Sequence, residues 1–222
     1  MSLFTRLREA ASEDWEAYTR HDFVTRLGEG TLPLPAFQDY LVQDYLFLVQ
    51  FARANALAAF KSRSLHDIGR AAESLNSILE ETALHVGLTE SWGISPEELE
   101  STPEKQATVA YTRYVLDCGM AGDLLDLEVA LTPCTLGYAE IGTALAPSLE
   151  AAPDHPYATW IAEYAGEDYQ AAARSSHAHL DELAGGELSP ARFAQLVTVF
   201  RTATRMETAF WQQALDGARV EA

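Results

Sequence analysis

The sequence predicts an all-α protein, a bundle of long helices. Apolar residues recur at spacings of three and four in most windows, which is the period of a buried helix face. No stretch shows sustained two-residue alternation bounded by a hairpin dipeptide. The chain has 222 residues, 48% of them hydrophobic, which suffices for a sizeable core. No low-complexity linker divides it, so we expect one domain over residues 1–222 with the last few residues frayed.

Breaks in the pattern set the boundaries of the earlier helices. Residues 28–33 combine two glycines with a proline and end a helix. Further along, Ser95 is a suitable N-cap, Pro96 fits a first helical turn and Glu98 completes a capping box. The next helix starts at Pro103.

Two further loops, at residues 151–156 and 185–190, separate the later helices. Each loop combines proline or glycine with polar residues. Together these breaks predict helices at residues 2–19, 21–28, 34–62, 66–90, 103–120, 122–148, 155–163, 167–185 and 190–216.

Charge and composition exclude several classes of function. The chain carries 15 Lys and Arg against 33 Asp and Glu, a net charge of −18. Such a protein repels phosphate backbones and anionic membranes, so we expect no nucleic-acid partner and no membrane partner. Two cysteines form no disulfide framework, and no apolar run has the length of a signal peptide or a membrane span. We therefore expect a cytoplasmic protein.

Polar residues interrupt several of the apolar helix faces. Asp44 lies within the stripe Phe37, Tyr40, Leu41, Phe47, Leu48 and Phe51, and Glu207 within the stripe Phe193, Val197, Phe200, Thr204 and Trp211. A third stripe places Cys134 and Tyr138 one turn apart, and a fourth contains Tyr164. Because carboxylates are rarely buried unpaired, Asp44 and Glu207 indicate either a ligand pocket or hydrogen bonds to buried partners. An inert thiol and ordinary core aromatics remain alternatives for the other three.

Metal binding has a weaker signal. Glu81 and His85, and likewise His177 and Asp181, are four residues apart and share a helix face. However, none of the six histidines follows a glutamate by three residues, as ferritin-like di-iron bundles require. The chain also lacks His-Glu-x-x-His, Cys-x-x-Cys and glycine-rich phosphate motifs. We expect no metal and no cofactor.

Three segments carry a resemblance to the TenA family, also called thiaminase II or aminopyrimidine aminohydrolase. They are His21-Asp22-Phe23-Val24 through Leu27, Gly30-Thr31-Leu32, Phe37, Tyr40-Leu41 and Gln43-Asp44; Pro133-Cys134-Thr135-Leu136-Gly137-Tyr138-Ala139-Glu140-Ile141-Gly142; and Tyr157, Trp160-Ile161, Tyr164, Met206-Glu207 and Phe210-Trp211. The resemblance covers nearly the whole chain, and Pro133-Cys134 is similar to the cysteine-containing branch.

This resemblance implies a haem-oxygenase-like up-and-down bundle without haem, assembled as a homotetramer. It also implies an enzyme of thiamin salvage that releases ammonia from 4-amino-5-aminomethyl-2-methylpyrimidine and, in many members, cleaves thiamin. By resemblance, Cys134 is the nucleophile, Glu207 the acid/base and Asp44 the carboxylate that binds the aminopyrimidine edge. Tyr138, Tyr164, Tyr111, Phe47 and Phe210 line the substrate site.

The residue types suit this chemistry. A carboxylate can form two parallel hydrogen bonds with a ring nitrogen and an exocyclic amine, which fits Asp44. If Asp44 keeps the ring protonated, Cys134 can add to an adjacent ring carbon and expel the substituent on the CH₂ group. Glu207 would protonate the leaving amine and then deprotonate water. One departure from the family lies beside this site, because Phe47 stands where tyrosine is common.

Two other functions remain open at this point. The same bundle could bind a pyrimidine without turnover, in which case replacing Cys134 would change no rate. A metal-dependent oxidase on a related bundle would use Glu81, His85, His177 and Asp181 and would purify with iron. The matching cysteine segment favours the hydrolase.

Overall fold

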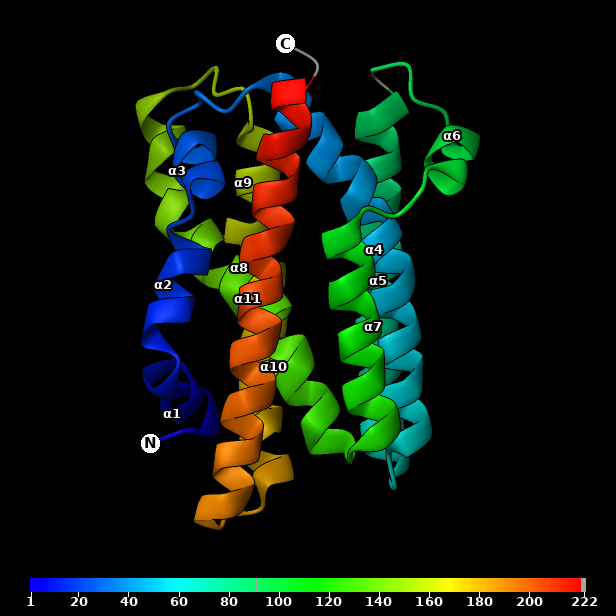
Figure 1. Ribbon diagram of the computed structural model, residues 1–222, viewed down its shortest axis with the longest axis vertical. Coiled ribbons are helices and arrows are strands. Elements are labelled where there is room, and N and C mark those ends of the chain that lie inside the picture. The colour runs from blue at the N-terminus through cyan, green and yellow to red at the C-terminus, as the bar shows by residue number, and fades with distance from the viewer. Residues whose placement is uncertain (91, 221–222) are drawn as a thin grey trace. The chain divides into compact units, whose positions relative to one another are not determined.

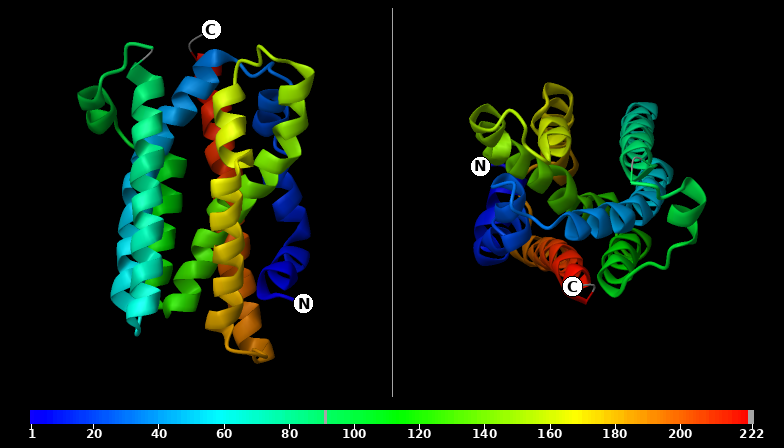
Figure 2. Two further views of the ribbon diagram at one scale, coloured as in Figure 1. Left: turned by 180° about the vertical axis from the view of Figure 1, so that it is seen from behind. Right: turned by 90° about the horizontal axis from the view of Figure 1, so that it is seen from above.

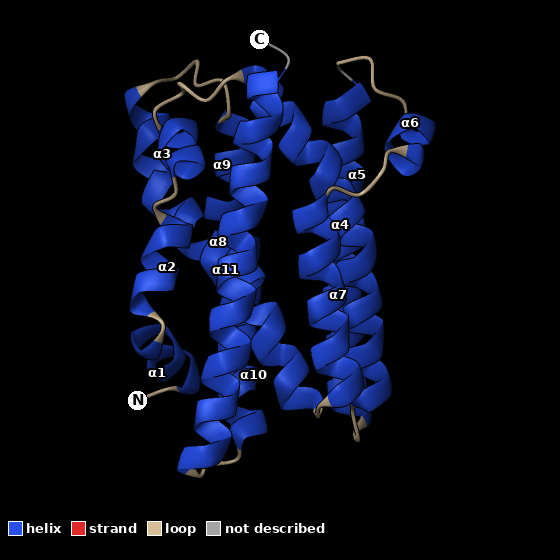
Figure 3. Ribbon diagram, viewed as in Figure 1, coloured by secondary structure: helices blue, strands red, loops and turns tan. Residues whose placement is uncertain are grey.

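The computed structural model describes residues 1–90 and 92–220, and all regular secondary structure in this part is helical (Figure 3). The predicted all-α class is therefore confirmed. None of the described helices is both long enough and apolar enough to span a membrane. The chain divides into two compact units, one of Met1–Leu32 with Glu128–Trp211 and one of Pro33–Leu127 with Gln212–Ala222. The single domain expected from the sequence stays a prediction.

The first unit is built on three short N-terminal helices and four helices from the second half of the chain (Figure 1). They are α1 (Leu3–Ala10), α2 (Ser12–Thr19), α3 (Asp22–Gly28), α9 (Ala158–Ala165), α10 (Glu167–Ala184) and most of α8 (Leu124–Ala151) and α11 (Pro190–Val220). Helix α1 packs against α2 and α10, and α9 packs against α10. Large aromatic side chains, among them Trp15, Tyr18 and Trp211, are fully buried in this unit.

The second unit is organised around α4 (Leu34–Lys61). Helices α5 (Leu65–Glu90) and α7 (Gln106–Ala121) both pack along α4 (Figures 1 and 2). The short α6 (Pro96–Ser101) also contacts α4, where Leu99 packs with Tyr45 and Leu46. The buried face of α4 includes Asp44, with Tyr40 and Phe47 one turn away on either side. The central helix of this unit thus carries Asp44, one of the two carboxylates that the sequence places within an apolar helix face.

Several helices differ from the ranges that the sequence predicts. The first predicted helix is divided into two helices, α1 and α2. Ala11, which lies between them, leaves the helical conformation with φ −120°. Helix α7 begins three residues later than expected, since the side chain of Gln43 accepts a hydrogen bond from the Lys105 backbone and donates one to Pro103. The Ser95 capping box is present, and it starts the six-residue helix α6, which the predicted ranges omit.

Helix α9 also begins three residues late. The Nδ1 atom of His155 accepts a hydrogen bond from the Tyr157 backbone and stabilises a turn there. The other helices begin and end within four residues of the predicted positions.

A glycine in α8 allows a close approach between two backbones. A Cβ atom at Gly142 would lie 2.5 Å from the carbonyl carbon of Tyr164 and 2.6 Å from its oxygen. Those atoms belong to the backbone and cannot move as a flexible side chain would. Gln170 fixes the same approach, donating from Nε2 to the carbonyls of Ala139 and Tyr164.

Substitution of Gly142 by alanine is therefore expected to destabilise the protein by about 1–3 kcal/mol, the usual cost of overpacking a core. Gly69 on α5 is the matched control, since nothing lies within 4 Å of its added Cβ. Gly69→Ala should instead stabilise by roughly 0.5–1 kcal/mol through helix propensity. Urea unfolding of both variants measures the two effects, and equal shifts would contradict the close approach.

Candidate active site

In the second unit, Asp44 is buried with only 4% of its surface exposed. The hydroxyl of Tyr40, one turn earlier on α4, donates to its Oδ2 at 3.3 Å. From α5, the Nδ1 atom of His85 approaches the same oxygen, also at 3.3 Å. Glu81 lies one turn before His85, and one ligand atom from each of Asp44, Glu81 and His85 falls within 4.8 Å of the others. The acidic group predicted from the α4 stripe therefore has a histidine and a second carboxylate beside it.

His85 is itself deeply buried, with 2% of its surface exposed. Burial disfavours the charged imidazolium and lowers the pKa of His85 to about 4. Its Nδ1 has no hydrogen-bond partner of acceptable geometry, although Asp44 is within 3.3 Å. At neutral pH the ring is uncharged, with a nitrogen facing a carboxylate.

This shift predicts a specific pH dependence of stability. Between pH 6.5 and about 4 the unfolded chain protonates this histidine and the folded chain does not, so folding becomes less favourable as pH falls. The two and a half pKa units correspond to about 3 kcal/mol between pH 7 and pH 4. Urea unfolding of wild type and His85→Gln across this range isolates the contribution, because the glutamine variant lacks it. Parallel pH profiles would contradict the lowered pKa, because they would mean that the imidazole is protonated as readily in the folded chain as in the unfolded chain.

One turn beyond Asp44, α4 presents an aromatic wall. Phe47 contacts Tyr111 of α7 with ring centroids 5.1 Å apart, and it stacks on Phe51 at 5.4 Å. Both Phe47 and Tyr111 are buried. The structure thus brings together Asp44, Phe47 and Tyr111, the three predicted site residues of this unit.

In the first unit, Cys134 lies in α8 next to a proline inside the helix and is half-buried. Pro133 has no N–H, so the helix lacks one backbone hydrogen bond at this point. Tyrosine hydroxyls from other helices donate to the carbonyls on either side of the cysteine, Tyr18 to Pro133 at 3.2 Å and Tyr169 to Thr135 at 3.4 Å. These bonds fix the turn that carries the thiol.

Gly137 provides the space for this arrangement. A Cβ at that position would come within 2.3 Å of the Tyr18 ring. The ring therefore packs directly on the α8 backbone, one turn from Cys134. The Pro-Cys-Thr-Leu-Gly sequence combines the proline, the thiol and the glycine that admits the tyrosine.

Tyr138 and Tyr164 are both buried and in mutual contact, with ring centroids 4.9 Å apart. Trp160 adjoins each of them, at 5.9 and 4.5 Å. On the other side, Tyr138 contacts Trp211 of α11 at 5.4 Å. This aromatic cluster brings the predicted tyrosines of α8 and α9 together.

Glu207 is 2% exposed and shares its face of α11 with Phe210 and Trp211. Figure 1 shows α8 and α11 running in the same direction. The Tyr138–Trp211 contact joins the two helices, and one turn back from each residue are Cys134 and Glu207.

The sequence alone assigned no role to His85. The only feature that pointed to this residue was its four-residue spacing from Glu81. Tyr18 and Tyr169 had no signal, since their hydroxyls bind backbone carbonyls far away in the chain. The proposed oxidase ligand set does not form as expected: His177 Nε2 bonds with the Ser2 hydroxyl at 2.8 Å, and Asp181 accepts from the Leu3 backbone at 2.7 Å. Both residues hold α1 against α10.

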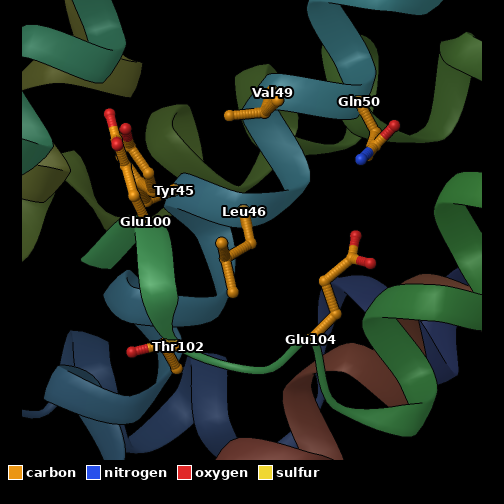
Figure 4. Close-up of a pocket in the computed structure, with 7 residues that line it drawn as sticks. All are labelled: Tyr45, Leu46, Val49, Gln50, Glu100, Thr102 and Glu104. Carbon is orange, nitrogen blue, oxygen red and sulfur yellow. The ribbon is translucent and has the colours of Figure 1, made fainter. Parts of the chain in front are cut away.

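A separate hollow of about 420 Å³ opens in the second unit (Figure 4). Its lining residues are Tyr45, Leu46, Val49, Gln50, Glu100, Thr102 and Glu104. None of the predicted site residues lines it. Burial and the neighbouring Glu100 raise the pKa of Tyr45, and Glu104 pairs with Arg113.

Solved structures define the class of this fold. A domain from Shewanella denitrificans described as having a heme oxygenase-like fold matches with a TM-score of 0.76 at 12% identity, over 99% of this chain and 94% of that one. A TenA family transcription regulator from Silicibacter sp. TM1040 matches with a TM-score of 0.91 at 44% identity, over 96% of both chains. The predicted haem-oxygenase-like fold is confirmed.

The profile of the TENA/THI-4/PQQC family matches residues 8–217, and the chain belongs to this family. An aminopyrimidine aminohydrolase from Halalkalibacterium halodurans is 40% identical over 97% of this chain and 96% of its own length. A Schizosaccharomyces pombe protein named putative hydroxymethylpyrimidine/phosphomethylpyrimidine kinase 2 is 42% identical over 89% of this chain, which spans 36% of that relative. The resemblance and the predicted class, an enzyme of the TenA family, are confirmed.

Proposed function

We propose that this protein is an aminopyrimidine aminohydrolase of thiamin salvage. It hydrolyses 4-amino-5-aminomethyl-2-methylpyrimidine: water replaces the amine on the CH₂ group, giving the hydroxymethyl pyrimidine and ammonia. The observation that carries the proposal is the 40% identity, end to end, with a relative named for this activity. The S. pombe relative supports the product, because its name joins this kind of chain to phosphorylation of hydroxymethylpyrimidine.

Asp44 is proposed to bind the aminopyrimidine edge. Its carboxylate is buried, so it interacts with a bound ring in surroundings of low dielectric, where hydrogen bonds to a charged group are strong. Tyr40 donates to one carboxylate oxygen and so restricts its rotation. Phe47 and Tyr111 supply flat apolar surface for the ring. Phe210 is proposed as a further wall.

Cys134 is proposed to add to a carbon of the protonated ring, so that the electron pair of the CH₂–N bond leaves with the amine. Glu207 gives its proton to that amine and then takes one from the water that adds to the CH₂ carbon. Expulsion of the thiolate restores the ring. The burial of Glu207 suits a group that must hold a proton before transferring it. Tyr138 and Tyr164 line the site beside the thiol.

The direct test is ammonia release from 4-amino-5-aminomethyl-2-methylpyrimidine by the unmodified protein, with the hydroxymethyl product followed by chromatography. We expect both products in equal amounts. Thiamin, assayed in parallel, tests cleavage at the same CH₂ group with the thiazole as leaving group. Binding of the pyrimidine without turnover of either compound would contradict the proposal and favour a non-catalytic pyrimidine-binding protein.

We further propose a homotetramer in the cytoplasm, as the family resemblance implies. Light scattering coupled to size-exclusion chromatography measures the assembly directly. A molar mass of four chains is expected, and a monomer at micromolar concentration would contradict it.

A further inference from the structure

Two helices of the second unit bring together three side chains of the types that bind metal ions in proteins. Helix α5 packs along α4 (Figure 2), and the contact brings His85 and Glu81 of α5 beside Asp44 of α4. Asp44 and His85 are buried and Glu81 is half-buried. The four-residue spacing of Glu81 and His85 places both on one helix face, as in helical zinc motifs.

His85 is the anomalous member of this group. Its Nδ1 is buried and has no hydrogen-bond partner, yet it lies 3.3 Å from Asp44 Oδ2. Buried polar atoms in folded proteins are nearly always satisfied, and each one that is not costs free energy. A cation between the nitrogen and the carboxylate would satisfy the nitrogen, while Tyr40 continues to donate to the same carboxylate oxygen.

The separation of these two atoms fits such a cation. Zinc binds nitrogen and carboxylate oxygen at about 2.0–2.2 Å, so two tetrahedral ligands lie roughly 3.3–3.5 Å apart. The observed 3.3 Å is the edge of such a tetrahedron. The third side chain, Glu81, places one ligand atom within 4.8 Å of those of the other two residues.

We propose that Asp44, Glu81 and His85 form a binding site for a divalent transition-metal cation, for which Zn²⁺ is the best fit. One imidazole nitrogen and two carboxylates offset the cation's charge and leave a coordination position open. The net charge of −18 attracts cations generally.

The site implies a regulatory effect that rests on the proposed function. Asp44 would serve both the cation and the aminopyrimidine, so the two would compete. Zinc should then inhibit hydrolysis competitively with the pyrimidine, whereas zinc binding itself requires no activity.

Calorimetric titration of the metal-free protein with Zn²⁺ tests the site, with visible absorption of Co²⁺ as a second readout. We expect one equivalent bound and the absorption bands of tetrahedral Co²⁺. His85→Gln and Glu81→Gln should each weaken binding by more than the roughly 10- to 100-fold that loss of a ligand's supporting partner costs. Of the two substitutions, Glu81→Gln should disturb the fold less, because this side chain is only half-buried.

His155→Gln is the matched control. His155 is also buried, but its ring nitrogens contact the Gly28 carbonyl and the Tyr157 backbone in the first unit. Its replacement should leave Zn²⁺ affinity unchanged. Equal affinity in wild type, His85→Gln and Glu81→Gln would overturn the site, as would absence of stoichiometric binding at millimolar Zn²⁺.

Competition separates this inference from the proposed function. Displacement of Zn²⁺ by the hydroxymethyl pyrimidine supports both. Stoichiometric Zn²⁺ binding that depends on His85 but is insensitive to the pyrimidine would support the metal site and count against the substrate role of Asp44.

Discussion

Replacement of Cys134 by alanine is expected to lower ammonia release by at least about 10³-fold, since removal of an enzyme's nucleophile has effects of this size or larger. The fold should survive, because Cys134 is half-buried and alanine is the best helix former. The hydroxymethyl pyrimidine should bind to the variant with affinity within a few-fold of wild type. Ammonia release and calorimetric binding, measured on the same preparation, distinguish lost chemistry from lost binding.

Cys118 provides the control for this experiment. It is the other cysteine of the chain, is also half-buried in a helix, and burial raises the pKa of its thiol. Cys118→Ala should therefore leave the rate unchanged. A Cys134→Ala protein that retains its full rate would rule out cysteine nucleophilic catalysis here.

Asp44→Asn is expected to lower kcat by about 10²–10⁴-fold, the range contributed by a positioned proton transfer, while KM changes much less. An asparagine side chain can still pair with a neutral aminopyrimidine edge through one donor and one acceptor, as it does with adenine. It cannot, however, hold a proton on the ring nitrogen. The variant thus separates binding of the ring from its activation, and steady-state kinetics with the aminopyrimidine measures both constants.

Asp39→Asn, on the same helix, is the matched control. Asp39 pairs with Lys105 and lies outside the predicted site. Its replacement should therefore change kcat by less than about twofold, against the 10²–10⁴-fold loss expected for Asp44→Asn. If Asp44→Asn raised KM and left kcat intact, Asp44 would bind the ring without activating it. A fold check by circular dichroism accompanies both variants, because Asp44 lies beside the buried His85.

Some features of the structure could be predicted because they depend only on residues close together in the sequence. The burial of Asp44 and Glu207 follows from helical spacing, because a residue three or four positions from buried neighbours must share their face. The Ser95 capping box is equally local, requiring only four consecutive residues. By contrast, the late start of α7 depends on Gln43, which lies some sixty positions earlier in the chain.

The side chains around the candidate site divide in the same way. The Pro133–Cys134 sequence and the Glu81–His85 spacing are visible in the chain. Contact of His85 with Asp44 is not, because it depends on how α5 packs along α4. The same holds for Tyr18 and Tyr169, whose hydroxyls reach carbonyls beside Cys134 from two other helices. A hydroxyl that donates to a distant carbonyl does not alter the spacing of apolar residues in its own helix, so the sequence pattern does not reveal it.

The sequence by itself thus determined the helical class, most helix boundaries and the inward faces that carry Asp44, Cys134 and Glu207. These properties depend on neighbours within a few residues, where helical geometry fixes which side chains lie together. Only the tertiary structure decided that His85 would be buried against Asp44 and that tyrosines would hold the turn around Cys134. Such contacts arise from helix packing, which brings together residues whose separation along the chain carries no information about their distance in space.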